Sequence, residues 1–187
     1  MSDRPLNLLG IAGSLRAGSW NRRLLAAAAG LMPDGAALTA FDLAEIPLYN
    51  EDLRETGYPA PVAALREAVA AADAVVFATP EYNYSVPGVL KNALDWASRP
   101  PAPPVAGKVC ATFGGSPGMH GTVRGQNHLK EVLRGMGVIV LPRPEVYVAR
   151  VNERFDAAGA LTDEDTRRFV RELLAATCDL ARRLRGA

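Results

Sequence analysis

The chain alternates between short, almost uniformly apolar segments and segments with the period of an amphipathic helix. The predicted strands are residues 6–12, 37–43, 73–79 and 108–113 and a broken fifth strand of residues 138–141 and 145–148. The predicted helices are residues 20–32, 62–72, 87–98, 122–136 and 163–185, with Pro87 in the first turn of the third and Thr162 as the cap of the last. Strands that are apolar on both sides must be covered on both faces, as in parallel sheets flanked by helices. The alternation therefore predicts an α/β fold with a doubly wound, five-stranded parallel sheet and helices on both faces.

The length and charge of the chain exclude several classes of protein. A length of 187 residues suits one domain, residues 1–187, and is short for a barrel of eight strand–helix units, which needs ~250 residues. Apolar residues make up 49% of the chain and the formal net charge is +1, so there is no broad field to attract nucleic acid or an anionic membrane. The sequence shows neither a signal peptide nor an apolar run near the ~18–20 residues of a membrane span. We therefore expect a cytoplasmic protein.

The loop after the first predicted strand carries many polar groups directly before a helix. Residues 13–21 read Gly-Ser-Leu-Arg-Ala-Gly-Ser-Trp-Asn. A helix N-terminus offers unpaired N–H donors and a positive dipole, and Ser14, Ser19 and Asn21 add side-chain donors beside the charge of Arg16. The loop therefore predicts a phosphate site. The alternative is a turn rich in serine and glycine in which Ser19 only caps the helix.

Two common phosphate loops are absent from the sequence. It has no G-x-x-x-x-G-K-[ST] of an NTPase, and Gly10 and Gly13 do not complete the G-x-G-x-x-G of a dinucleotide fold. Asp42 could be mistaken for the ribose-binding acid of such a fold and is interpreted as a surface turn residue. A mononucleotide with a terminal phosphate, such as FMN, suits the loop better than a dinucleotide.

The loops after the third and fourth predicted strands suit a flat heterocyclic ring. Residues 79–88 read T-P-E-Y-N-Y-S-V-P-G, and backbone groups around residues 81–83 could pair with the rim of a pyrimidine-like ring. A surface that exposes Tyr82 and Tyr84 also suits a contact between subunits, and both interpretations stay open. Residues 113–118 (FGGSPG) either let a ligand approach the backbone or form a plain turn. Because ligands of such sheets bind beyond the carboxyl ends of the strands, we expect the three loops to form one site.

These motifs resemble those of the NADPH-dependent FMN reductase family, in particular its quinone and chromate reductase branch. Residues 13–21 match G-S-L-R-x-x-S-x-N, residues 79–96 match T-P-E-Y-N-Y-S-V-P-G-x-L-K-N-A-[LI]-D-W, and residues 114–116 match a looser third motif. The likeness spans nearly the whole chain. It implies a flavodoxin-like sheet with strand order 2-1-3-4-5 and assembly into dimers or tetramers through Tyr82, Tyr84 and residues 87–98.

The resemblance also implies which residues bind FMN. They are Ser14, Leu15, Arg16, Ser19, Trp20 and Asn21 in the first loop, Pro80, Glu81, Tyr82, Asn83 and Tyr84 in the second, and Gly115 and Ser116 in the third. In this scheme the first loop holds the phosphate, the second borders the isoalloxazine ring and Ser116 flanks it. Trp20 stands where relatives often carry phenylalanine.

The resemblance implies an FMN-dependent enzyme that takes electrons from NADPH or NADH and passes them to small acceptors, such as quinones and chromate or other metal oxyanions. Hydride transfer is the chemistry of the flavin itself, so no catalytic side chain is expected. His120 and His128 have no paired acid nearby in the sequence and are interpreted as structural, and Glu81 as orienting its loop or pairing with another subunit. Cys110 and Cys178 have no ligand neighbours at metal-binding spacing, so we expect buried thiols and no metal site. With no second nucleotide fingerprint, NAD(P)H must dock over the flavin and leave before the acceptor enters, which predicts ping-pong kinetics.

Three alternatives share parts of this pattern. An azo- or nitro-reductase, or a supplier of free reduced flavin, would use the same half-reaction. An electron-carrier flavodoxin without NAD(P)H activity would usually be strongly acidic, and the net charge of +1 argues against it. A flavin-binding interaction or stress-sensor protein would keep its flavin oxidised when NADPH is added without oxygen.

Overall fold

The computed structural model describes residues 4–185 and contains one parallel sheet. Its strands are β1 (Leu6–Ala12), β2 (Ala36–Phe41), β3 (Ala74–Ala78), β4 (Val109–Gly115), β5 (Ile139–Val140) and β6 (Val146–Val148). All pairings between these strands are parallel, in the order β2-β1-β3-β4-β5, with β6 also pairing with β4. The predicted order is confirmed, and it is the order of a flavodoxin-like sheet.

The broken fifth strand forms two separate strands. β5 pairs with the first two residues of β4, and β6 pairs with its last three. Pro142 and Pro144 stand between them and have no N–H to donate to a ladder. The sheet therefore has six strands where five were predicted.

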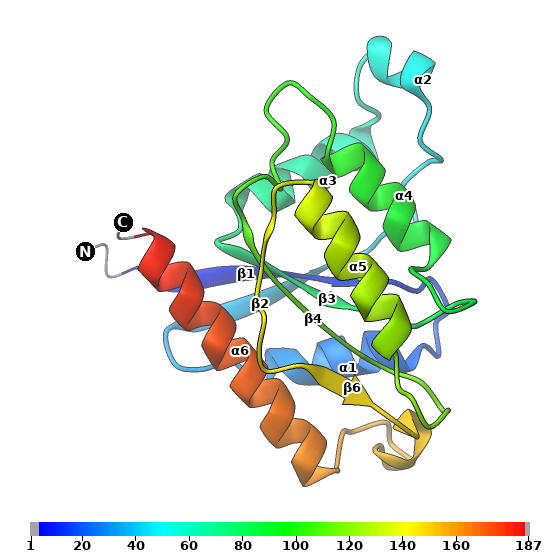
Figure 1. Ribbon diagram of the computed structural model, residues 1–187, viewed down its shortest axis with the longest axis vertical. Helices are drawn as coiled ribbons and strands as arrows, with labels where there is room; N and C mark the ends of the chain where they lie inside the picture. Colours follow the sequence, from blue (N-terminus) through cyan, green and yellow to red (C-terminus); the bar gives the residue numbers. More distant parts are fainter. Residues whose placement is uncertain (1–3, 186–187) are drawn as a thin grey trace.

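The helices form a layer on each face of the sheet (Figure 1). They are α1 (Trp20–Ala29), α2 (Glu51–Glu55), α3 (Ala60–Ala71), α4 (Gly88–Ala97), α5 (Val123–Gly135), the 3-10 turn η1 (Val151–Glu153) and α6 (Glu164–Arg185). α1 and α6 cover one face, and α3, α4 and α5 cover the other. None of the helices within residues 4–185 is long and apolar enough to cross a membrane.

The central strands bury both of their sides. In β1, Leu6 and Leu8 pack in the layer with α1 and α6, whereas Leu9 and Ile11 pack in the layer with α3, α4 and α5. All five residues of β3 are buried. This two-sided burial is the reason that these strands are nearly continuous apolar runs in the sequence.

The structure corrects the predicted start of two helices and adds one helix that was not predicted. The cap of α6 is Asp163, whose Oδ1 accepts a hydrogen bond from the Thr166 N–H at 2.9 Å, so the assignment to Thr162 was wrong by one residue. Pro87 lies at the N-cap of α4 and not inside its first turn. α2 was not predicted, because none of its residues is buried and it therefore has no apolar period.

The loops that follow β1, β3 and β4 start from neighbouring points on one edge of the sheet. The Gly13 N–H donates to the Ala78 carbonyl, and the Thr79 N–H donates to the Phe113 carbonyl, both at 2.9 Å. The parallel arrangement therefore places the three predicted site loops side by side.

Candidate functional site

A cavity of about 180 Å³ opens at the sheet edge where β1, β3 and β4 end. Residues from all three loops line it: Ser14, Arg16, Ser19, Trp20, Asn21, Pro80, Glu81, Tyr82, Gly115, Ser116 and Pro117. The predicted residues Leu15, Asn83 and Tyr84 are not part of this lining. The prediction missed Pro117, although it directly follows Ser116 in the third motif. The topology thus brings most of the predicted residues together.

The first loop turns back on itself before α1 begins. The Ser19 N–H donates to the Arg16 carbonyl at 3.0 Å, and the Ser14 hydroxyl accepts from the Arg16 N–H at 3.4 Å. The Ser19 hydroxyl accepts from the Arg22 N–H as the N-cap of α1. Both serines are buried. Ser19 therefore caps the helix and also lines the cavity.

Positive charge and free donors gather at the start of α1. Arg16 is exposed, and no carboxylate among residues 4–185 pairs with it. First-turn N–H groups have no partner inside a helix, and those of Trp20 and Asn21 have no acceptor within the described residues. A cation next to free N–H groups at a helix N-terminus forms an anion-binding arrangement.

Asn21 directs its side chain toward the end of β4. Its Nδ2 donates to the Gly115 carbonyl and its Oδ1 accepts from the Gly115 N–H, both at 2.9 Å. Only 3% of the residue is exposed. The amide therefore acts like the backbone of a neighbouring strand and ties the first loop to the third. The predicted contact between Asn21 and a phosphate stays a prediction.

The second loop contains a tight hairpin turn. Tyr82 and Ser85 exchange two backbone hydrogen bonds of 3.1 and 2.9 Å. Between them, Asn83 has a φ of 50° and Tyr84 a φ of 64°, as in a two-residue turn with two left-handed positions. Asparagine adopts this conformation readily, but a bulky side chain such as that of Tyr84 rarely does, so the turn is strained. The turn leaves Tyr82 51% and Tyr84 66% exposed, in agreement with the expected tyrosine surface.

The glycines of the third loop lie in a crowded place. A Cβ on Gly114 would overlap the carbonyl oxygen of Thr79, and a Cβ on Gly115 would lie 2.7 Å from Val151 Cγ2. At Gly114 the space that a side chain would need is filled by protein. Glycine therefore serves close packing at this position and not the approach of a ligand.

The segment after β6 supports the third loop and was not recognised from the sequence. The Val151 N–H donates to the Ser116 carbonyl at 3.0 Å, and the Arg150 N–H donates to the Gly118 carbonyl at 3.1 Å. Arg150 has a positive φ of 48°. No motif marks this contact, because it joins backbone groups more than 30 residues apart.

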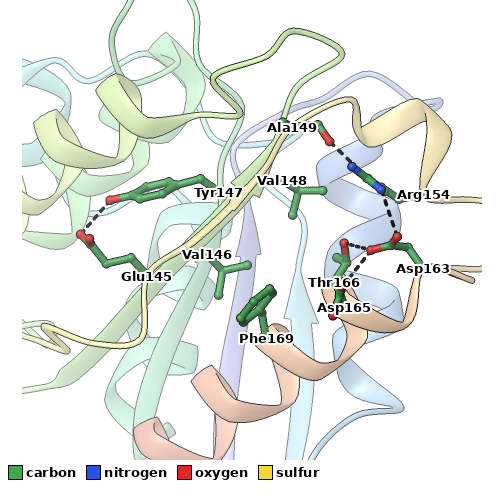
Figure 2. A pocket seen from close by; sticks show the side chains of 10 residues that line it. All are labelled: Glu145, Val146, Tyr147, Val148, Ala149, Arg154, Asp163, Asp165, Thr166 and Phe169. Carbon is green, nitrogen blue, oxygen red and sulfur yellow. Dashed lines mark hydrogen bonds and ion pairs between the residues drawn. The ribbon is translucent and has the colours of Figure 1, made fainter.

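A larger cavity of about 340 Å³ lies beside β6 and the start of α6 (Figure 2). Its charged groups are paired with protein: Arg154 donates to the Ala149 carbonyl at 3.4 Å and to Asp163 at 3.0 Å. Asp163 also accepts from the Thr166 hydroxyl at 2.6 Å. The smaller cavity combines N–H donors and a cation that have no partner within the described part of the chain, so we place the candidate site there.

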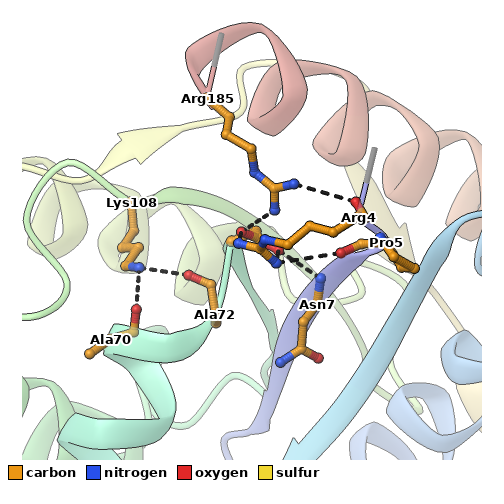
Figure 3. Close-up of polar contacts among 8 residues, drawn as sticks. Arg4, Pro5, Asn7, Ala70, Ala72, Lys108 and Arg185 are labelled. Atoms are coloured by element: carbon orange, nitrogen blue, oxygen red, sulfur yellow. Dashed lines mark hydrogen bonds and ion pairs between the residues drawn. The ribbon is translucent and has the colours of Figure 1, made fainter. Parts of the chain in front are cut away.

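A charged cluster around Asp73 lies at the opposite edge of the sheet. Figure 3 shows the side chains of Arg4 and Arg185 pointing toward the same place beside Asn7. The Asp73 carboxylate pairs with Arg4 at 2.8 Å and with Arg185, and it accepts from the Asn7 N–H at 2.8 Å. Burial acts to raise the pKa of Asp73, but the hydrogen bonds from Asn7, Arg185 and Arg4 outweigh it and lower the pKa below its ordinary value. This cluster joins residues near both ends of the chain to the start of β3.

Two further interpretations of single residues can be compared with the structure. Cys110 and Cys178 are buried, as predicted, and burial raises the pKa of both thiols. Asp42 pairs with Arg22 at 2.7 Å on the surface, and this hydrogen bond lowers the pKa of Asp42. Asp42 is thus a surface residue in an ion pair.

Comparisons with known proteins show what this chain is similar to. The model of a protein family described as NADPH-dependent FMN reductase matches residues 6–153, which contain all three loops. The chain is 49% identical over 186 residues to an NAD(P)H-dependent FMN reductase of Pseudomonas aeruginosa, covering 100% of both chains. It is 39% identical over 170 residues to a 2-hydroxy-1,4-benzoquinone reductase of a Burkholderia species, covering 90% of this chain and 92% of the relative. The solved structure of FerB, a flavoenzyme NAD(P)H:(acceptor) oxidoreductase from Paracoccus denitrificans, aligns with a TM-score of 0.87 at 34% identity, covering 95% of this chain and 98% of FerB.

Proposed function

The chain belongs to the NADPH-dependent FMN reductase family, and we propose that it binds FMN in the cavity at the carboxyl edge of the sheet and passes electrons from NAD(P)H to quinones. As a member of this family it is an enzyme that uses FMN and NAD(P)H. The observation that carries the proposed site is that Arg16, which pairs with no carboxylate of residues 4–185, meets a helix N-terminus and two further loops around one cavity. The relative named as a benzoquinone reductase supports quinones as the acceptor class.

The chemistry of the first loop fits the phosphate of FMN. Arg16 offers a charge that no carboxylate of the described residues neutralises, and the N–H groups of Trp20 and Asn21 need acceptors. A phosphate supplies negative charge and several acceptor oxygens at once. The hydroxyls of Ser14 and Ser19 border the same cavity and can each donate one hydrogen bond. We therefore assign the phosphate to this loop.

We assign the flavin ring to the second and third loops. The backbone of residues 80–83 would border one side of the ring, and Gly115 and Ser116 would flank it from the third loop. When bound, FMN supplies the hydride transfer, and the protein holds and orients it. None of the lining residues is a histidine or a cysteine, and the Glu81 carboxylate is bonded to backbone N–H groups of α5. We therefore assign no catalytic side chain.

We propose that the nicotinamide and the acceptor use the open side of this cavity in turn. Residues 1–187 contain no second nucleotide fingerprint, so a separate NAD(P)H site is not expected. Ping-pong turnover follows, with parallel double-reciprocal lines and competition by each substrate at high concentration. Steady-state rates with quinone, chromate and azo acceptors, under NADPH and under NADH, would also identify the acceptor class. Intersecting lines would contradict the shared site.

Removal of the Arg16 side chain tests the assignment of the phosphate. Arg16→Ala is expected to weaken FMN binding by about 10- to 100-fold, the range for a charged hydrogen bond, and to leave riboflavin binding unchanged. Quenching of flavin fluorescence gives both dissociation constants. Arg171→Ala removes the same charge from an exposed position on α6 and is the matched control. Equal affinity of the wild-type protein for FMN and riboflavin would contradict a phosphate site in the first loop.

We also propose that the protein self-associates into dimers or tetramers. Tyr82 and Tyr84 are more than half exposed and lie just before α4. Exposed aromatic side chains on a loop held by hydrogen bonds suit a subunit contact, because little entropy is lost when they are covered.

A further inference from the structure

The carboxylate that lines the candidate site is used by a neighbouring helix. Glu81 follows β3, and its Oε2 accepts hydrogen bonds from the Arg124 N–H and the Gly125 N–H, both at 2.9 Å. Its side chain is 11% exposed. The two donors belong to the first turn of α5, which lies more than 40 residues further along the chain.

α5 has no cap of its own at this end. Its N-cap residue Thr122 makes no side-chain hydrogen bond to the helix backbone. The Thr122 hydroxyl instead accepts from Gln126 Nε2 at 2.8 Å. First-turn N–H groups need acceptors, and a negative charge is favourable at the positive end of the helix dipole. Glu81, in the second loop, supplies both the acceptor and the negative charge.

The second loop and α5 approach each other closely at Gly125. A Cβ on Gly125 would lie 3.1 Å from the Ser85 carbonyl oxygen and 3.2 Å from Glu81 Cβ, so a larger residue would push the loop away from the helix. The far end of the loop is held as well, since His128 Nδ1 lies 3.1 Å from the Ser85 hydroxyl. The loop is thus fastened to one helix at Glu81 and at Ser85.

Arg124 adds contacts to the strained part of the loop. Its guanidinium lies 3.7 Å from Glu81 Oε1 and 4.6 Å from the centre of the Tyr84 ring. Tyr84 is one of the two turn residues with positive φ. A strained turn persists only where its surroundings hold it, and these surroundings are the first turn of α5.

We propose that Glu81 is a positioning residue, whose carboxylate caps α5 and so fixes the backbone of residues 80–85 against the flavin ring. Glu81 acts through α5 and exchanges no proton with the substrates. The inference rests on the proposed function, in which this backbone borders the ring.

The first test measures the cap in the protein without flavin. In Glu81→Ala, the amide hydrogens of Arg124 and Gly125 are expected to exchange at least about tenfold faster, because two charge-assisted hydrogen bonds are lost. In Glu81→Gln, part of the protection returns, since Oε1 of glutamine can accept from both donors. Glu131→Ala removes an exposed carboxylate from the same helix and is expected to leave both amides unchanged.

The second test measures flavin binding. Glu81→Ala is expected to weaken FMN and riboflavin by the same factor, at least about fivefold, because the loop borders the ring that both flavins share. Glu81→Gln is expected to recover part of both affinities. This differs from Arg16→Ala, which is expected to weaken FMN alone. If Glu81 only stabilised the fold, Glu81→Ala would lower the stability of the protein without weakening FMN and riboflavin by the same factor.

Each outcome decides a different point. Unchanged exchange at Arg124 and Gly125 would overturn the cap, and faster exchange with unchanged flavin affinities would overturn the positioning role. A loss for FMN alone would overturn it too, because it would place Glu81 at the phosphate. If the wild-type protein bound neither flavin, the proposed function would fail, whereas the amide exchange would still decide whether Glu81 caps α5.

Discussion

Replacement of Asn21 distinguishes a residue that holds the third loop from one that binds the phosphate. Asn21→Ala removes both hydrogen bonds to Gly115, so the N–H and the C=O of this buried residue lose their partner. Two such bonds contribute about 1 kcal/mol each, and a buried polar group without a partner costs about 1–3 kcal/mol. We expect the free energy of unfolding to fall by about 2–4 kcal/mol. The loss should be at the lower end of this range if water enters the vacated space and bonds to Gly115.

Asn21→Asp keeps the shape of the side chain and makes the effect depend on pH. The introduced carboxylate can accept from the Gly115 N–H but repels the Gly115 carbonyl unless it is protonated, so its pKa is raised in the folded state. Below the unfolded pKa of about 3.9, the group is protonated in both states and the penalty is small. As the pH rises, the unfolded state loses its proton first, so stability falls until the raised folded pKa is reached. The variant should therefore approach the wild type at pH 4 and resemble Asn21→Ala at pH 7.

Urea unfolding followed by circular dichroism measures these differences, and flavin fluorescence measures binding. If Asn21 holds the third loop, FMN and riboflavin weaken together in Asn21→Ala. Asn127→Ala removes an exposed amide from α5 and is the control. Wild-type stability combined with a loss of affinity for FMN alone would refute the reasoning and assign Asn21 to the phosphate.

Three further measurements address other parts of the molecule. The pKa of Asp73 is lowered in the folded protein, so its ion pairs stabilise the fold above pH ~4. The difference in unfolding free energy between the wild type and Asp73→Asn should therefore shrink as the pH falls below that value. A difference that stays constant with pH would contradict this. Gly114→Ala should destabilise the protein strongly because its Cβ would overlap the Thr79 carbonyl, whereas Gly88→Ala, with open space and a helical position, should be neutral or slightly stabilising in the same urea titration. Sedimentation at micromolar concentration should give at least twice the chain mass of 19.9 kDa, and Tyr84→Ala should shift the equilibrium toward monomer; a wild-type protein that sediments only as monomer would contradict the proposed subunit contact.

Strand positions were predictable from the sequence where burial is two-sided. The bounds of β1 agree with the prediction because residues 6–12 are an apolar run that only the exposed Asn7 interrupts, with polar segments on either side. β4 extends two residues beyond the predicted end, through Gly114 and Gly115, because β6 pairs with them and overrides the weak strand preference of glycine. α2 was missed because a short helix without buried residues leaves no period in the sequence.

Which loops form the candidate site was easier to predict than which of their residues contact one another. The three loops could be assigned to one edge because strand direction alone places them there. That Asn21 bonds to Gly115, 94 residues away, depends on the exact separation of α1 and β4, which one sequence does not encode locally. The contact of Glu81 was equally hidden in the sequence. Its position in the motif suggested that it orients its loop, but did not show that its carboxylate accepts a hydrogen bond from the first turn of α5.

The long motif at residues 79–96 also contains residues that hold other parts of the protein. Asn92 donates to the Pro47 carbonyl at 2.8 Å and accepts from the Tyr49 N–H at 2.7 Å, and Trp96 Nε1 donates to the Pro47 carbonyl at 2.9 Å. These α4 side chains fix the segment after β2, so membership in a motif does not by itself imply contact with a ligand. Polar atoms without a protein partner in the described structure, as at Arg16, are open to a ligand, whereas polar atoms bonded to backbone position a loop. Where loop backbone binds a ligand, the residues that position the loop must be placed as accurately as the residues that touch the ligand. A shift of the loop would move every N–H that faces the ligand.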